Sequence, residues 1–283
     1  SFTNSKSSGG ISIYISDNGT DNITFVGDGT SGVLIQDAQL EQGLVATDYI
    51  ETTTVPVYAG LTDNMPRLDY TDATCPSLLL EPSRTNAVPI SEYIVGMSGL
   101  GGNTSTLAWN SSIQNPEGYY GVTEYTLNTY VRKSDILTGL SLGDKISYSI
   151  FAKSDSNANL ILGGQFGGEN ATFNVNTGTL VSQGANCDSY DIIDYGNGWH
   201  RYLVNITYQN SISNGLSYAY FQWSSNTESV YLWGWQVERD ATYPTSYIPT
   251  YGSSQTRAAD VSTVSKAVSS EGSLFINVGG TSQ

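Results

Sequence analysis

The sequence holds one histidine, His200, so any mechanism that needs an imidazole must use this residue. His200 follows Trp199 in a stretch, GWHRYLV, whose alternation predicts a strand with Trp199, Arg201 and Leu203 on one face and His200 on the other. A histidine inside a strand is more often a structural or surface residue than a catalytic one. We therefore predict no catalytic role for His200.

The 26 acidic residues offer a second route to catalysis, because glycoside hydrolysis needs two positioned carboxyl groups. None of these acids stands in a recognisable catalytic motif. Regularly stacked short repeats, which would predict a long parallel β-helix, are also missing. The sequence therefore predicts a chain that is not an enzyme.

Oxygen-rich turns give two candidate calcium loops. One is Asp17-Asn18-Gly19-Thr20-Asp21 followed by Asp28-Gly29, and the other contains Asp188, Asp191 and Asp194. The first lacks the distal glutamate of an EF-hand, and D-N-G is by itself a strong turn signal. We predict turns with no metal and no other cofactor, and a structural calcium ion stays open as the alternative.

Aromatic residues in predicted loops point to binding chemistry. Sugars present apolar C–H faces that stack on Trp and Tyr rings, while Asn, Asp and Gln side chains supply hydrogen bonds. The candidates for carbohydrate binding are Trp109, Tyr119, Tyr120, Tyr190 and Tyr195. Trp199, Trp233 and Trp235 lie in predicted strands and are interpreted as core, and the loop tyrosines could equally face a neighbouring subunit.

The stretch Val230–Thr250, VYLWGWQVERDATYPTSYIPT, predicts a buried strand followed by an extended exit from the domain. Pro244 and Pro249 exclude a helix in its second half, because proline fixes φ and lacks an N–H donor. Gln236 and Glu238 fall on alternate positions of the strand. We expect both side chains to anchor the exit segment to the sandwich.

An earlier stretch, Gly32–Thr53, repeats this pattern. The corresponding pairs, in order, are Gln39 with Gln236, Glu41 with Glu238, and Tyr49 with Tyr247. A motif used twice suits a domain-closing strand better than a binding pocket. Gln236, Glu238 and Tyr247 are accordingly predicted to be structural residues of that strand.

The composition predicts an all-β fold. It includes Gly 30, Tyr 20 and Trp 5 but only 13% charged residues, which fits many short strands joined by turns. Strand patterns recur at short intervals without a helical segment long enough for a crossover, so we predict two-sheet antiparallel β-sandwiches. Residues 1–54 are assigned to the last strands of a preceding domain, 55–86 to an ordered proline-containing connector, 87–258 to a complete sandwich, and 259–283 to a linker and the first strand of a following domain.

The formal net charge of -15 disfavours a polyanionic partner, so we predict no binding to nucleic acid. Roughly 18 consecutive apolar residues are needed to span a membrane, and no run in the sequence reaches that length. We therefore predict no membrane insertion.

Four segments in a fixed order resemble a cassette found in tail-fibre and other virion proteins of bacteriophages. They are LLLEPSRTN at 78–86, YGNGWHRYLV at 195–204, YLWGWQVERDATYPTSYIPT at 231–250 and RAADV at 257–261. The resemblance implies a jelly-roll β-sandwich similar to carbohydrate-binding modules. SEGSLFINV resembles the first strand of the concanavalin-like or laminin-G-like domain that often follows. The chain departs from the cassette at Trp235, where a small residue is usual.

The resemblance further implies a structural part of a virion, a tail or head fibre on the particle surface. Its partners would be other virion subunits, most simply in a homotrimer, and its sandwich domains would be displayed for attachment to host-surface glycans. Two alternatives stay open: a carbohydrate-binding module of a secreted bacterial polysaccharide-processing protein, and a capsid decoration protein that binds no glycan.

Overall fold

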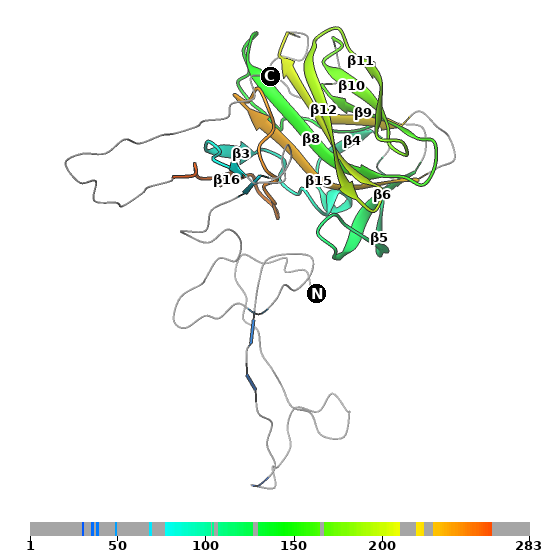
Figure 1. Ribbon diagram of the computed structural model, residues 1–283, viewed down its shortest axis with the longest axis vertical. Coiled ribbons are helices and arrows are strands. Elements are labelled where there is room, and N and C mark those ends of the chain that lie inside the picture. Colours follow the sequence, from blue (N-terminus) through cyan, green and yellow to red (C-terminus); the bar gives the residue numbers. More distant parts are fainter. Residues whose placement is uncertain are drawn as a thin grey trace, which may run out of the picture.

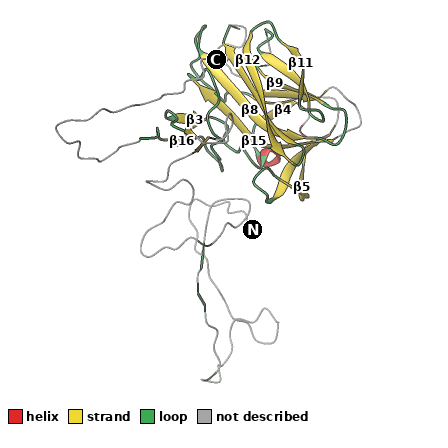
Figure 2. Ribbon diagram, in the orientation of Figure 1, coloured by secondary structure: helices red, strands yellow, loops and turns green. Residues whose placement is uncertain are grey.

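The computed structural model describes residues 77–261 except 103, 105–106, 127–129, 165–166, 210–218 and 224–228, together with residues 30, 35–36, 38–39, 49 and 68–69. Within these residues strands dominate, and the helical part is a short 3-10 turn, η1 (Ile94–Gly96) (Figure 2). The prediction of an all-β fold is confirmed. The repeat within residues 32–53, the first candidate calcium loop and the strand predicted after residue 272 lie almost entirely outside the described residues.

Two six-stranded sheets form the body of the fold (Figure 1). The strands of the first sheet are β4 (Leu100–Gly102), β7 (Tyr130–Lys133), β9 (Asn159–Gly163), β10 (Asn170–Asn174), β11 (Thr179–Gln183) and β14 (Ala219–Trp223). Those of the second are β5 (Leu107–Gln114), β6 (Tyr120–Thr126), β8 (Lys145–Lys153), β12 (Cys187–Gly196), β13 (Trp199–Thr207) and β15 (Ser229–Arg239).

The strand order is β11-β10-β9-β14-β7-β4 in the first sheet and β12-β13-β8-β15-β6-β5 in the second. Each pairing of neighbouring strands in the two sheets is antiparallel. The predicted antiparallel β-sandwich is confirmed. β12 and β5 form opposite edges of the second sheet, which decides how far apart their side chains lie.

Two short strand pairs accompany the sandwich. β1 (Leu68–Asp69) pairs with β2 (Ser77–Leu78), and β3 (Arg84–Asn86) pairs with β16 (Gln255–Arg257). β3 belongs to the predicted connector and β16 to the end of the predicted sandwich domain. The last residues of the connector are therefore held against the chain that leaves the sandwich. The other connector residues lie mostly outside the described part.

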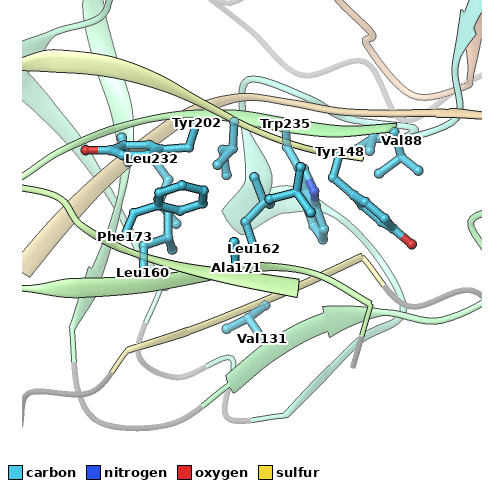
Figure 3. Close-up of a cluster of buried hydrophobic side chains, with 14 of the residues drawn as sticks. Val88, Val131, Tyr148, Leu160, Leu162, Ala171, Phe173, Tyr202, Leu232 and Trp235 are labelled. Atoms are coloured by element: carbon cyan, nitrogen blue, oxygen red, sulfur yellow. The ribbon is translucent and has the colours of Figure 1, made fainter. Parts of the chain in front are cut away.

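The hydrophobic core lies between the two sheets, as Figure 3 shows. On β8, Tyr148, Ile150 and Ala152 point into it, because successive side chains of a strand face opposite ways. Facing residues of the first sheet include Leu160 of β9 and Phe173 of β10. All five side chains are buried. The inner faces of β8, β9 and β10 are therefore apolar here, as the alternation in the sequence predicts.

A β-bulge in β15 changes which face its side chains occupy. The pairing with β8 shifts between Trp233 and Gln236, and Gly234 adopts a φ of 64°, a conformation that favours glycine. Leu232 and Trp235 both belong to the core between the sheets, whereas Trp233 belongs to a separate buried cluster. Without the inserted residue, strict alternation would put Trp235 and Trp233 on the same face.

Candidate functional site

The outer face of the second sheet carries this separate cluster, made of Val122, Phe151, Trp199 and Trp233. The exit segment, residues 241–250, covers it with Tyr247. The ring centre of Tyr247 lies 4.7 Å from that of Trp233 and 5.8 Å from that of Phe151. The predicted closing residue Tyr247 thus packs on the sheet, and the aromatic cluster beneath it is closed from solvent.

Gln236 and Glu238 are fully buried on the same face and hydrogen-bond to the exit segment. Thr245 donates its backbone N–H and its hydroxyl to the Glu238 carboxylate, at 2.8 and 2.5 Å. The N–H of Ile248 donates to Oε1 of Gln236 at 2.7 Å. These hydrogen bonds give a partner to the backbone N–H groups of Thr245 and Ile248. Both residues follow the end of β15, so their N–H groups would otherwise be buried without a partner.

Arg201 and Asn86 hold the same segment from two other strands. The Arg201 guanidinium donates to the carbonyl of Thr245 at 2.8 Å and to the hydroxyl of Ser149 at 2.9 Å. The Asn86 amide donates to the carbonyl of Ile248 at 2.9 Å. Burial lowers the pKa of Arg201, and the nearby Tyr195 and Glu238 oppose that effect.

Glu81 completes the network at its outer end. Its carboxylate accepts the N–H of Ser246 at 2.7 Å and pairs with Arg257 at 2.8 Å. Its backbone N–H donates to Asp260 at 2.8 Å. All four sequence segments that resemble the phage cassette therefore meet in one polar network around the exit segment. Each of the four segments contributes buried or half-buried side chains that hold the exit segment against the sandwich.

Three of the predicted sugar-binding residues come together on the β5–β6 hairpin. Trp109 of β5 is half-buried, and its ring lies where a side chain on Gly121 would be, since an added Cβ would meet it at 2.3 Å. Tyr93 contacts Trp109 edge-on, with ring centres 5.0 Å apart. Tyr119 and Tyr120 lie at the end of the same hairpin with 37% and 59% of their surfaces exposed.

The turn of this hairpin, residues 115–119, is held by Asn115. Its side-chain oxygen accepts the N–H groups of Glu117 and Tyr119 at 3.0 and 3.1 Å, and its own N–H donates to the carbonyl of Tyr119 at 2.7 Å. An Asx turn of this kind fixes the backbone locally. Tyr119 is therefore held by an ordered turn, and Tyr120 follows it as the first residue of β6.

Tyr190 and Tyr195 lie elsewhere, on β12 at the opposite edge of the sheet. Tyr190 is exposed and contacts Phe173 edge-on at 6.1 Å. Tyr195 is exposed and contacts Phe151 edge-on at 4.8 Å. Three of the five sequence candidates thus lie on the hairpin and two on β12, and the Trp199 indole next to the Tyr195 end of β12 donates to the carbonyl of Gln114 on β5 at 2.9 Å.

A buried carboxyl that the sequence reasoning missed contacts the chain that follows β15. Glu92 has 8% of its surface exposed, and its Oε1 accepts the phenol hydroxyls of Tyr251 at 3.1 Å and Tyr247 at 3.4 Å. Burial, together with the negative charge of Glu117, raises the pKa of Glu92 to about 7. Burial also raises the pKa of Glu117. Nothing in the local sequence around Glu92 signals these contacts.

The second candidate calcium loop does not gather its carboxylates. Asp188 binds Lys145 and Thr207, and Asp191 and Asp194 each accept a nearby backbone N–H. In the described part of the chain no group of three or more His, Cys, Asp or Glu side chains is arranged to hold a metal ion. His200 is half-buried on β13, 5.9 Å from the ring of Tyr202. No helix among the described residues is long and apolar enough to cross a membrane.

Comparison with solved structures finds a likeness to the enzymatically active domain of tailspike protein 4 from bacteriophage CBA120. The two are 12% identical with a TM-score of 0.32, and the match covers 54% of this chain and 21% of that chain. No protein-family model matches the sequence, and no curated protein matches it.

The prediction that the chain is not an enzyme is corrected at this point. The similar tailspike domain is itself enzymatically active, and that finding stands against the prediction. The likeness is too distant to transfer a particular activity.

Proposed function

We propose that this chain is part of a bacteriophage tail protein and that its β-sandwich attaches the particle to a glycan on the host surface through the β5–β6 hairpin. The ordered cassette in the sequence supports the assignment to a virion surface. The partners in this proposal are other virion subunits, assembled as a homotrimer, and a bacterial surface glycan.

The arrangement of the hairpin is the observation that carries the glycan proposal. Two consecutive exposed tyrosines stand at the tip of the hairpin, Tyr119 at the end of an ordered turn and Tyr120 at the start of β6, and the Tyr93–Trp109 ring pair packs on the same hairpin. Aromatic rings of this kind stack on the apolar faces of sugars. An ordered turn loses little conformational freedom on binding, so more of the contact energy is available for affinity.

The hairpin proposal is tested by binding of the purified chain to a glycan array and to whole bacteria. Tyr120→Ala removes the most exposed ring of the hairpin and leaves the sheet pairing intact. We expect about a fivefold loss of affinity, corresponding to one stacking contact of about 1 kcal/mol. Full binding by a double Tyr119→Ala, Tyr120→Ala variant would rule the hairpin out as the site.

Tyr190→Ala is the matched control, because Tyr190 is also an exposed tyrosine of the second sheet. It lies on β12, the edge strand opposite to β5 in that sheet. We expect this variant to bind like the parent chain. Loss of binding in Tyr190→Ala alone would move the site to β12.

A further inference from the structure

One hydrogen bond joins the start of β13, beside the end of β12, to the tip of the β5–β6 hairpin. The indole N–H of Trp199 donates to the carbonyl of Gln114 at 2.9 Å. In the strand pairing, Trp199 lies opposite Gly196, which follows Tyr195 in β12. Gln114 lies opposite Tyr120 of β6. The two ladders therefore meet at this hydrogen bond, although β12 and β5 are opposite edges of the sheet.

Tyr195 lies on the outer face of the second sheet, beside the aromatic cluster. Its ring contacts Phe151 of that cluster edge-on, with ring centres 4.8 Å apart. The side chain still has 47% of its surface exposed. Tyr190 of the same strand instead contacts Phe173, which belongs to the core between the sheets. The two tyrosines therefore face opposite sides of β12, and only Tyr195 faces the outer side.

Tyr120 lies on the same outer face. Successive side chains of a strand face opposite ways, so Tyr120 of β6 shares its face with Val122, a member of the outer cluster. Gly121, between them, faces the other way, since a Cβ built on it would meet the Trp109 ring. Ile113 of β5 also packs against the outer cluster. Tyr120 and Tyr195 are therefore two exposed rings on one face of the sheet.

The side chain at the meeting point of the two ladders is polar and uncharged. Gln114 is exposed, and its amide both donates and accepts hydrogen bonds, as the hydroxyl groups of sugars require. The net charge of -15 on the chain disfavours an acidic ligand. Two aromatic rings with an amide between their strands therefore suit a neutral sugar chain, whose apolar ring faces stack on tyrosine.

We propose that Tyr120, Gln114 and Tyr195 form one elongated surface that binds a neutral oligosaccharide. This inference rests on the proposed function, in which the hairpin tyrosines bind a glycan, and it adds a second sugar position at Tyr195. The two rings lie on either side of the Trp199–Gln114 contact, so different sugars of the chain stack on them. The same contact fixes the two positions relative to each other before binding, which lowers the entropy cost of binding.

The test uses the array glycan that the purified whole chain binds most tightly, together with shorter fragments of that glycan made by partial acid hydrolysis. We expect the affinity of the parent chain to rise with fragment length. Tyr195→Ala should weaken binding of the full glycan about fivefold, and combined with Tyr120→Ala about 25-fold. Tyr195→Phe keeps the ring and should bind like the parent chain. Gln114→Ala keeps the carbonyl that accepts the Trp199 N–H, and it should weaken binding about fivefold.

Tyr190→Ala is the control on the same strand, and it should bind every fragment like the parent chain. Full binding of the longest glycan by Gln114→Ala, or by a folded Tyr195→Ala variant, would overturn the inference. The proposed function would survive that result if Tyr120→Ala still weakened binding. An acidic glycan as the tightest ligand would also overturn the inference alone. Full binding by the double Tyr119→Ala, Tyr120→Ala variant, or a parent chain that binds no glycan, would overturn both.

Discussion

At the scale of single residues, Glu238 shows how a strand in this chain is made to end. Its carboxylate takes both hydrogen-bond donors of Thr245, and its neighbour on the same face, Gln236, takes the N–H of Ile248. A buried carboxylate is tolerated here because it is fully hydrogen-bonded and lies near Arg201. These residues stabilise the fold and are covered by it.

Glu238→Ala should therefore lower the stability of the fold and leave the structure of the β5–β6 hairpin unchanged. The change leaves two donors of Thr245 and the nearby Arg201 charge buried and uncompensated, which costs about 3 kcal/mol. Urea denaturation measures the loss. Glycan binding by the folded fraction should be unchanged, and a folded variant that no longer binds would give Glu238 a role in the site.

Glu238→Gln is the matched control for this prediction. The amide keeps the size of the side chain and one acceptor oxygen, so part of the bonding to Thr245 survives. We expect a loss of stability clearly smaller than that of the alanine variant. Equal losses would show that the charge of Glu238, rather than its hydrogen bonds, holds the exit segment.

At the scale of elements, the bulge in β15 decides how one strand serves two clusters. The extra residue, Gly234, lets Trp233 join the outer cluster and Trp235 the core between the sheets. A regular strand would have to expose one indole or bury it against the wrong partners. Gly234 is required both by its φ of 64° and by its closeness to Phe151.

Gly234→Ala should destabilise the sandwich. The new Cβ would lie 2.7 Å from the Phe151 ring and 3.3 Å from that of Tyr247, in addition to the strain of a positive φ. We expect a loss of about 3 kcal/mol in thermal or urea unfolding.

Gly196→Ala separates the two causes. Gly196 has a φ of 76°, and an added Cβ would meet nothing within 4 Å. Only backbone strain remains there, so the loss should be about 1 kcal/mol. If Gly196→Ala lowers stability as much as Gly234→Ala does, the overlap with Phe151 contributes nothing to the loss of stability.

At the scale of the whole molecule, the two sheets, the exit segment and the β3–β16 pair form one continuous assembly. The polar network fastens residues 81–86 to residues 245–260, and Figure 1 shows the β3–β16 pair beside the sandwich. The chain that enters the sandwich and the chain that leaves it are therefore held together.

The proposed homotrimer is checked by light scattering on the purified chain. The expected mass is three times the 30.4 kDa of one chain. Each chain carries a net charge of -15, so subunits repel one another and added salt should strengthen assembly. A monomer that binds glycan at every salt concentration would favour a binding module of a secreted protein, and a trimer that binds none would favour a decoration protein.

Local chemistry made part of this structure predictable. Alternation of apolar and polar residues predicts β8, β13 and β15, because successive side chains of a strand face opposite ways. Pro244 and Pro249 predict an extended exit segment, because proline cannot continue a helix or a central strand. Gln236 and Glu238 stand out because polar residues at alternate positions of a buried strand need partners.

The sequence by itself determined that this chain is an all-β protein with a closing strand and an extended exit, since those properties depend on neighbours along the chain. The tertiary structure alone decided that Trp109, Tyr119 and Tyr120 share a hairpin while Tyr190 and Tyr195 lie at the far edge of the sheet. It also decided that Glu92 accepts the hydroxyls of Tyr247 and Tyr251. Strand order and the bulge at Gly234 set these distances, because they join residues that sequence spacing does not relate.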